Sequence, residues 1–295
     1  MIVVAGGTGV LGSVIVRRLL GAGRSVCVLT RDPARASALA AEGAGIATAD
    51  LRDPDAVRLA CRHATHVVTT ANAFTGGGAA AVSAVDLQGT RNLIEAARDA
   101  GVERFVFTSA RLPREFAAVD YFAAKFANED YVRGCGVPYT ILKPTAFMET
   151  WGRMLLDDVV GKGVAQIFGP GDLPINYVAV ADVAEVAVMA LDRPDTLNGE
   201  VEIGGPENLT MLQVVDIVER VTGRRAKRRH LPVTVMRVLP ALVRPFNPVF
   251  ARAVQAGALT ATIPQPFDPA PMLARFPITP TRLEDWVRAA VGHPA

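Results

Sequence analysis

Short apolar runs alternate along the first half of the chain with longer stretches in which apolar residues recur at helical spacing. The short runs predict strands at residues 1–5, 25–30, 45–50, 65–70, 104–109 and 139–143. The stretches between them predict helices. The first of these ends at residues 21–23, and the others span about 34–41, 54–61, 80–100 and 119–134. This alternation predicts βαβ units, and hence an α/β fold in which a parallel sheet carries helices on both faces.

Beyond Pro144 the alternation loosens and the elements become harder to delimit. Helices are predicted at 154–161, at 182–192 with Asp182 as its N-cap, and at 212–222. Short strands are predicted at 175–180 and 201–203, whereas the proline-rich stretch 231–280 allows no bounds. We expect a sheet domain over residues 1–150, joined by a strand and helix returning near 175–205. Residues 151–295 are expected to form mainly a small C-terminal subdomain over the carboxyl ends of the strands.

The composition excludes several classes of protein. The 295 residues are 50% hydrophobic, and a formal net charge of +2 gives no general attraction to nucleic acid or anionic membranes. Three widely spaced cysteines and four histidines without ligand spacing predict neither a disulfide framework nor a metal site. The first apolar run has no basic region ahead of it, and no apolar stretch approaches the roughly 20 residues of a membrane-spanning helix. We therefore expect a cytoplasmic protein without nucleic-acid or membrane partners.

The junction between the first strand and the first helix carries three glycines at three-residue spacing, in the sequence Gly6-Gly7-Thr8-Gly9-Val10-Leu11-Gly12. At such a junction one glycine allows a sharp turn, a second lets the main chain approach phosphate groups, and a third allows helix and strand to pack closely. The helix N-terminus then directs free N–H groups at the negative charge. The sequence therefore predicts a binding site for the pyrophosphate of a dinucleotide.

The end of the second strand indicates which dinucleotide is bound. An NAD site would place an acidic residue there, about 20 residues past the glycines, to bind the ribose 2′-hydroxyl. Here the strand ends in Arg31, whose forked guanidinium matches a 2′-phosphate in charge and shape. We therefore predict NADP, with NAD left as the alternative by the neighbouring Asp32.

The ends of the third and fourth strands are expected to border the same cofactor, because ligands gather at this edge of an open α/β sheet. Asp50 can accept a hydrogen bond from the adenine amino group while Leu51 packs on the ring. The alternative is that Asp50 belongs to a turn that leads into Pro54. The small residues of Thr70-Ala71-Asn72, which end the fourth strand, leave room for the middle of the cofactor.

The helix predicted at 119–134 carries a candidate acid–base pair. Tyr121 and Lys125 are four residues apart and therefore share a helix face. An ammonium beside a phenol favours the phenolate and would lower the tyrosine pKa toward the range of a working general acid. Ser109, at the end of the fifth strand, could hold a substrate oxygen beside Tyr121. A Tyr-x-x-x-Lys spacing also arises by chance, but here it follows the fifth strand of a predicted dinucleotide fold.

With these residues in place, the chain resembles the short-chain dehydrogenase/reductase superfamily, and within it the extended and atypical NmrA-like NAD(P)-binding proteins. The resemblance implies a Rossmann-type, doubly wound parallel sheet with a small C-terminal substrate-binding subdomain. It rests mainly on the glycine segment and on segments 30–33, 50–53, 86–92, 121–125, 138–145, 180–184 and 203–210. The last seventy residues match less sharply.

The resemblance also implies roles for individual residues. Thr8 to Leu11 would contact the pyrophosphate, and Lys125 the nicotinamide ribose. Pro144 and Thr145 would border the nicotinamide ring. Tyr121 would move a proton at the substrate oxygen while hydride passes to or from the cofactor. The loop after the fifth strand departs from the family pattern, so that Ser109 or its neighbour Ala110 occupies the serine position.

These observations lead to one main hypothesis and two alternatives. The first is an NADPH-dependent oxidoreductase that acts on a small or medium organic carbonyl, enone or imine, as a monomer or homodimer. The second is a non-catalytic, NmrA-like regulator or scaffold that senses NADP(H). The third is an epimerase or dehydratase that uses the nicotinamide transiently.

Two further segments leave alternatives open. The basic run 223–230 either contacts nucleic acid or an acidic partner, or is solvated, and the near-neutral total charge favours the solvated form. The apolar residues Phe147, Met148, Trp151, Met154 and Phe168 either line a hydrophobic substrate pocket or pack in the core.

Overall fold

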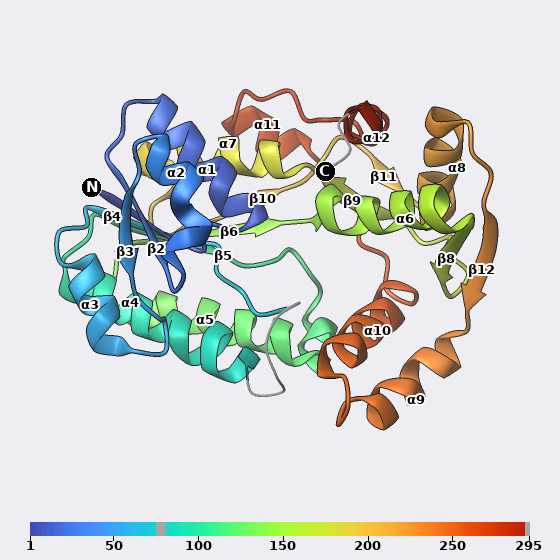
Figure 1. Ribbon diagram of the computed structural model, residues 1–295, viewed down its shortest axis with the longest axis horizontal. Coiled ribbons are helices and arrows are strands. Elements are labelled where there is room, and N and C mark those ends of the chain that lie inside the picture. Colours follow the sequence, from blue (N-terminus) through green and yellow to red (C-terminus); the bar gives the residue numbers. More distant parts are fainter. Residues whose placement is uncertain (75–80, 293–295) are drawn as a thin grey trace. The chain divides into compact units, whose positions relative to one another are not determined.

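The computed structural model describes residues 1–74 and 81–292, which form two compact units (Figure 1). Unit 1 comprises Met1–Ala110, Asp120–Lys143 and Val183–Glu202. Unit 2 comprises Arg111–Val119, Pro144–Asp182 and Ile203–Ala295. Each unit has its own sheet structure and its own apolar core.

Unit 1 is built on a seven-stranded sheet in the order β10-β6-β5-β4-β1-β2-β3. The pairs from β3 to β6 are all parallel. Because β1 lies between β2 and β4, the strand order reverses beside β1, and ligands of such sheets bind at the carboxyl ends of the strands at this point. The strands are β1 (Ile2–Ala5), β2 (Val26–Thr30), β3 (Gly45–Thr48), β4 (His66–Thr69), β5 (Arg104–Thr108), β6 (Tyr139–Pro144) and β10 (Gly199–Ile203).

Helices cover both faces of this sheet, which explains why its central strands are apolar on both sides. On one face lie α1 (Val10–Gly21) and the unit 1 part of α7 (Val180–Asp192), joined by an ion pair between Arg18 and Glu185 (Figure 1). On the other face lie α3 (Pro54–Cys61), α4 (Thr90–Asp99) and α5 (Asp120–Gly134). All residues of β1 and β5 are buried between these layers. The shorter elements are η1 (Pro33–Ala36), α2 (Ser37–Ala41), η2 (Val82–Gly89) and η6 (Pro194–Thr196).

The α/β fold and the parallel sheet predicted from the sequence are confirmed. One predicted helix, 80–100, is divided into a π-helical segment, η2, followed by α4, and its first residue lies outside the described residues. Gly89 is the last residue of η2, and a Cβ added to it would lie 2.9 Å from the Leu51 side chain in the loop after β3. This close packing accounts for a glycine at this position in the helix.

Unit 2 contains two small sheets, β11-β9-β7 and β12-β8, with helices packed on them. Its strands are β7 (Ala146–Phe147), β8 (Val164–Phe168), β9 (Ile175–Val178), β11 (Asn208–Leu209) and β12 (Lys227–Leu231). Its helical elements are η3 (Arg114–Ala118), η4 (Met148–Gly152), α6 (Arg153–Asp157), η5 (Asp158–Lys162), α8 (Met211–Thr222), α9 (Val233–Val243), α10 (Pro248–Thr260), α11 (Ala270–Arg275) and α12 (Leu283–Gly292).

Met148 is buried in the core of this unit, with Trp151, Met154 and Phe168 packed against that core. These contacts favour the packing alternative for these four residues, whereas Phe147, on β7, is half-buried and is not part of this core.

The N-terminus of α7 differs from the prediction that Asp182 caps it. The helix begins at Val180, and the carboxylate of Asp182 accepts hydrogen bonds from the N–H and Oγ1 of Thr281, at 2.7 and 2.9 Å. The N–H of Val180 instead donates to both carboxylate oxygens of Glu149, at 3.1 and 3.0 Å. The cap is therefore supplied from 31 residues away, where no local pattern reveals it.

Replacing Glu149 by alanine is expected to destabilise unit 2. This carboxylate also accepts from Trp286 Nε1 on α12 at 3.2 Å, and burial raises its pKa above the ordinary value. Its removal leaves the N–H of the buried Val180 and the Nε1–H of the half-buried Trp286 without this acceptor, at a cost of about 1–3 kcal/mol. Urea unfolding of Glu149→Ala measures the loss, and Glu115→Ala, at an exposed glutamate of the same unit, is the control. Equal stability of the two variants would contradict the capping role.

Candidate cofactor and catalytic site

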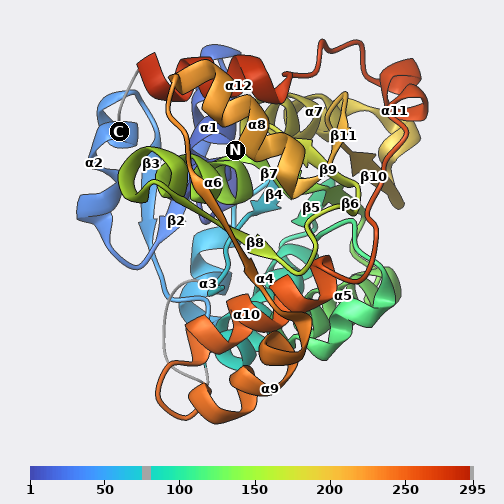
Figure 2. The same ribbon diagram turned by 90° about the vertical axis from the view of Figure 1, so that its right-hand side faces the viewer.

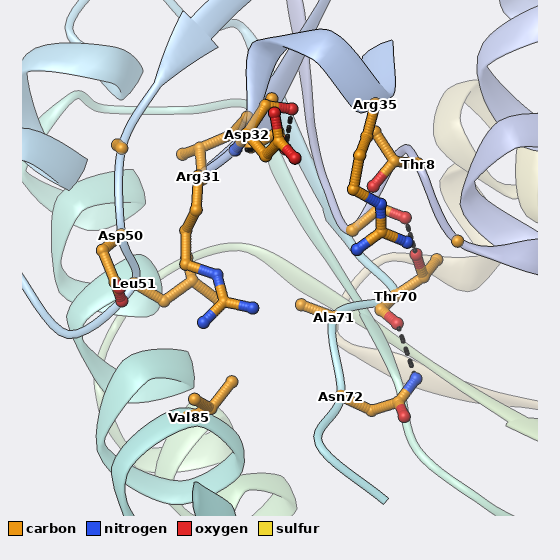
Figure 3. Close-up of a pocket in the computed structure, with 15 residues that line it drawn as sticks. Thr8, Arg31, Asp32, Arg35, Asp50, Leu51, Thr70, Ala71, Asn72 and Val85 are labelled. Atoms are coloured by element: carbon orange, nitrogen blue, oxygen red, sulfur yellow. Dashed lines mark hydrogen bonds between the residues drawn. The ribbon is translucent and has the colours of Figure 1, made fainter. Parts of the chain in front are cut away.

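A cavity of about 210 Å³ lies in unit 1 at the carboxyl ends of β1, β2, β3 and β4 (Figure 3). Its position at the reversal of strand order is where open α/β sheets bind ligands. Nine of the predicted cofactor residues line it, namely Gly6, Thr8, Gly9, Arg31, Asp50, Leu51, Thr70, Ala71 and Asn72. Six further lining residues were not in the predicted set, namely Leu29, Thr30, Asp32, Arg35, Ala49 and Val85.

Any side chain at Gly6 or Gly12 would clash with nearby backbone atoms. Gly6 has a φ of +82°, and a Cβ added to it would lie 2.5 Å from the backbone nitrogen of Ala71. A Cβ on Gly12 would lie 2.1 Å from the carbonyl oxygen of Gly6. The first glycine therefore lets the main chain turn against the end of β4, and the third lets α1 pack onto that turn.

The N-terminus of α1 differs from those of several other helices in lacking a side-chain cap. Gly9 occupies the cap position and provides no side-chain hydrogen bond, and the first turn holds no acidic residue. In contrast, Asp53 caps α3, Thr210 caps α8 and Asn247 caps α10. The first N–H groups of a helix have no carbonyl partner within it and carry partial positive charge. Together with the glycine turn, they form a donor set that fits a diphosphate.

Two arginines, Arg31 and Arg35, direct their guanidinium groups into this cavity (Figure 3). Arg31 follows β2, and Arg35 lies one turn later on η1. The carboxylate of Asp32 accepts from the N–H of Ala34 at 3.0 Å and caps η1. Sequence reasoning missed Arg35, although the Asp32-Pro33 signal for a helix start would have placed it one turn from Arg31.

Asp50 belongs to the turn that the sequence left open as the alternative to an adenine contact. The Asp50 carboxylate accepts from the N–H of Arg52 at 2.9 Å and from its guanidinium at 3.0 and 2.6 Å. This ion pair with Arg52 lowers the pKa of Asp50. Asp50 therefore belongs to the turn before α3, and both Asp50 and Leu51 line the cavity.

The end of β4 borders the glycine turn closely. Thr70 Oγ1 donates to the carbonyl oxygen of Gly6 at 3.2 Å, and the N–H of Thr70 donates to that of Ala5 at 2.9 Å. Ala71 and Asn72 continue along the wall of the cavity (Figure 3). The small side chain of Ala71 leaves the space between the two arginines and the glycine turn open.

The remaining predicted cofactor residues do not line this cavity, and they are Val10, Leu11, Gly12, Lys125, Pro144 and Thr145. Val10 is exposed on α1, whereas Leu11 and Gly12 are buried beneath it. Pro144 and Thr145 belong to unit 2. Thr145 Oγ1 is hydrogen bonded to Asn176 Oδ1 at 2.9 Å, and the N–H of Thr145 donates to the carbonyl of Ile203 at 2.9 Å.

Lys125 lies on α5 with its ammonium group held at the carboxyl end of β5. Its Nζ donates to the carbonyl oxygen of Thr108 at 2.7 Å. It also lies 5.1 Å from the ring centroid of Phe107 and 5.5 Å from that of Tyr121. Burial lowers the pKa of Lys125, and the carboxylates of Asp86 and Glu129 partly offset this effect. The predicted sharing of one helix face by Tyr121 and Lys125 is present in the structure.

Tyr121 is half-buried and its ring is fixed by aromatic neighbours. Its ring centroid lies 5.0 Å from that of Phe74 and 5.1 Å from that of Phe122, both in edge-to-face arrangements. Such contacts restrict the ring without using the phenol oxygen. These contacts hold the Tyr121 ring on the same face of α5 as Lys125.

The geometry of Ser109 disagrees with its predicted role. The residue is buried, and its Oγ donates to Oε1 of Glu129 on α5. Glu129 is itself buried and paired with Arg133 and Lys143, at 3.1 and 3.5 Å. The hydroxyl is thus committed to an interior carboxylate, so Ser109 as found does not present its proton to a substrate oxygen.

Other kinds of site receive no support from the described part of the chain. Within residues 1–74 and 81–292, no group of histidines, cysteines and carboxylates could hold a metal ion. No helix among these residues is long and apolar enough to cross a bilayer. In the basic run 223–230, Arg225 pairs with Glu219 at 3.2 Å, and Arg228 pairs with Asp216 and Glu219.

Comparison with solved structures supports the fold. A crystal structure of an NADPH-dependent quinone oxidoreductase from Escherichia coli, complexed with NADPH, matches with a TM-score of 0.79. The match covers 99% of this chain and 100% of that one at 21% identity. A triphenylmethane reductase from Citrobacter, complexed with NADP(H), matches with a TM-score of 0.77 at 20% identity, over 98% and 99% of the two chains.

Comparison with characterised sequences identifies the family. The photosystem II assembly factor Ycf39 of Synechocystis is 27% identical over 99% of this chain and 91% of its own. The NAD(P)H azoreductase of Xenophilus azovorans is 29% identical over 82% and 80% of the two chains. The NmrA-like family profile matches residues 1–249. The chain therefore belongs to the NmrA-like family, among NAD(P)-binding Rossmann-type proteins that include NAD(P)H-dependent reductases.

Proposed function

We propose that this protein is an NADPH-dependent oxidoreductase that reduces a small or medium organic carbonyl, enone or imine. The observation that carries the proposal is the Tyr121–Lys125 pair on α5, with the ammonium fixed by the Thr108 carbonyl at the carboxyl end of β5. A buried cation beside a phenol, at the edge of the sheet where the ligand cavity opens, is an arrangement suited to proton transfer.

The cavity supports NADP as the cofactor. We propose that Arg31 and Arg35 bind the 2′-phosphate, which two guanidinium groups match by charge and by forked geometry. Asp32 is occupied in capping η1, which counts against its binding a ribose 2′-hydroxyl of NAD. The glycine turn and the N-terminus of α1 would hold the diphosphate, and Asp50 and Leu51 would border the adenine.

When bound, the cofactor supplies the hydride for the reaction. After its bond to Thr108, the Lys125 ammonium keeps two N–H groups that can hold the nicotinamide ribose hydroxyls. Tyr121 donates its phenolic proton to the substrate oxygen or nitrogen, and the nearby ammonium stabilises the phenolate that results. We assign no polarising role to Ser109. Pro144 and Thr145 are proposed to border the nicotinamide on the strength of the family resemblance.

Unit 2 is proposed to be the substrate-binding part of the molecule. The reductases among the relatives support a substrate with a conjugated, electron-poor group, since their names specify azo and quinone compounds. The test is NADPH consumption at 340 nm across a panel of quinones, enones, aldehydes and azo compounds. Turnover with NADPH is expected for at least one class, and binding of NADPH without turnover on any class would contradict the proposal.

A second function is supported by the similarity to the assembly factor Ycf39 over nearly the whole chain. We infer that a cofactor-sensing binding protein is the alternative, in which the dinucleotide sets the conformation and a protein partner reads it. This function predicts NADPH binding without turnover, and a partner whose affinity differs between the NADPH and NADP⁺ forms.

The affinity for NADPH is expected to fall at alkaline pH because Lys125 loses its charge. Since burial lowers its pKa, the ammonium deprotonates below 10.5, the ordinary value, and the charged donor to the ribose is lost as pH rises. The measurement uses the Tyr121→Phe variant, which lacks the phenol. In this variant the Kd for NADPH should rise about tenfold as Lys125 loses its proton. In Tyr121→Phe/Lys125→Met the Kd should be high and independent of pH. A wild-type-like Kd in that double variant would contradict the role of Lys125.

A further inference from the structure

Helix α9 (Val233–Val243) is mostly apolar, although one of its apolar faces is in contact with solvent. Met236 and Pro240 are buried, Met236 in a cluster with Val254 and Ala258 of α10, and α9 and α10 lie side by side in Figure 2. On the outer face, Val235, Val238 and Leu242 are 43%, 62% and 66% exposed. Their spacing of three and then four residues places them on one stripe of the helix. The apolar stripe of an amphipathic helix normally packs against a partner, so we expect this stripe to be covered.

The stripe continues beyond the end of α9 into large aromatic side chains. The chain keeps turning after α9, where the N–H groups of Phe246 and Asn247 donate to the carbonyl of Val243. Phe246, four residues after Leu242, is 89% exposed, and Phe250 at the start of α10 is 46% exposed. We refer to Val235, Val238, Leu242, Phe246 and Phe250 as the outer face of the α9–α10 hairpin. These are five of the ten large hydrophobic residues that are exposed in the described chain.

The segment of the chain that carries this face has charged residues of one sign only. Residues 220–267 contain nine lysines and arginines and no acidic residue, whereas the rest of the chain holds 22 basic and 29 acidic residues. Some of this charge is neutralised, because Arg220, Arg225 and Arg228 form ion pairs with residues outside the segment. Arg237 and Arg244 lie on and directly after α9 and are exposed. A partner that binds the outer face must therefore offer an apolar surface and be compatible with, or attracted by, the positive charge of these arginines.

We propose that the outer face of the α9–α10 hairpin docks onto an anionic lipid membrane, with its apolar side chains inserted among the headgroups. Exposed aliphatic and aromatic side chains flanked by arginines are the pattern of helices that lie in the membrane interface. Anionic lipids attract such arginines, while the apolar side chains gain by leaving water. A second copy of the chain is a poorer occupant, because self-association through this face would bring the arginines of both copies together.

This proposal departs from the expectation, drawn from a net charge of +2, that the protein has no membrane partner. Net charge averages over the chain and does not show that basic and acidic residues are separated along it. The proposal is independent of the catalytic one, since it uses none of the residues that line the cofactor cavity.

The test is co-sedimentation of the full-length protein with lipid vesicles. Vesicles of phosphatidylcholine with about 30% phosphatidylglycerol should bind the protein, and vesicles of phosphatidylcholine alone should bind it at least about tenfold more weakly. Leu242→Ser/Phe246→Ser should weaken binding to the anionic vesicles at least about tenfold. The control is Leu59→Ser, which removes an exposed apolar side chain from α3, where Leu59 is 62% exposed. Arg237→Glu should weaken binding to anionic vesicles only.

Three outcomes would overturn the proposal. The first is failure of the wild-type protein to bind anionic vesicles. The second is equal loss of binding in Leu59→Ser. The third is a wild-type dimer that Leu242→Ser/Phe246→Ser converts to a monomer, which would assign the face to a second copy of the chain. NADPH titration of each variant verifies that unit 1 remains folded.

Discussion

Replacing Tyr121 by phenylalanine is expected to lower kcat by about 100-fold or more, the usual contribution of a positioned general acid. The Kd for NADPH should remain within about twofold of wild type, because Tyr121 is proposed to contact the substrate and not the cofactor. The ring contacts with Phe74 and Phe122 involve no hydroxyl group and are preserved in the variant, so its geometry should be unchanged. Steady-state kinetics on the best substrate of the panel and a fluorescence titration with NADPH provide the two numbers.

Tyr131 provides a matched control on the same helix. Its hydroxyl donates to Oε1 of Glu95 at 2.7 Å, and the residue is half-buried, as Tyr121 is. Tyr131→Phe therefore loses a hydrogen bond from α5 at a position without a proposed role in the reaction. Its kcat should stay within about threefold of wild type, a change that a lost structural hydrogen bond can cause. Unchanged kcat in Tyr121→Phe, or an equal loss in the two variants, would contradict the assignment of Tyr121 as the acid.

The first half of the fold could be predicted from sequence because each signal there is local. Strands buried on both faces, such as β1 and β5, appear as continuous apolar runs, and the glycines mark the turn after β1. Unit 2 offers fewer such signals. Its strand β9 and helix α8 lie where the sequence predicts a strand and a helix, but β7 and β11 are two residues long and exist through pairing with β9. Sequence periodicity cannot detect a two-residue strand, because it contains only one period.

The site shows the same division between local and long-range information. The predicted members of the cofactor cavity each follow a strand, and the topology of the sheet brings strand ends together. Ser109 also follows a strand, but its hydroxyl is directed by Glu129, twenty residues later on α5. The cap of α7 likewise depends on Glu149, which no spacing rule connects with Val180. Residue type and position predicted which side chains reach this edge of the sheet, and tertiary hydrogen bonds decide what each of them contacts there.

The clearest consequence of the cavity concerns the choice of cofactor. Arg31→Ala and Arg35→Ala should each weaken NADPH binding by about 10- to 100-fold, since a hydrogen bond to a charged group contributes about 1.5–3 kcal/mol. Binding of NADH should change by less than about threefold, because NADH lacks the 2′-phosphate. In Arg31→Ala/Arg35→Ala the effects should combine to about 100-fold or more, although neighbouring residues need not be additive. Titration of each variant with both cofactors measures the ratio of the two affinities.

The controls separate recognition of the phosphate from damage to the fold. Arg17→Ala removes an exposed arginine of α1 that pairs with Glu42 outside the cavity, and it should leave both affinities unchanged. Asp32→Ala should weaken the cap of η1 and shift Arg35 with it, so NADPH binding should weaken while the preference does not pass to NADH. If Asp32→Ala instead lost NADH binding selectively, Asp32 would be the ribose ligand and NAD the natural cofactor. Equal loss of NADPH and NADH in the double variant would mean that the two arginines support the cavity and do not read the phosphate.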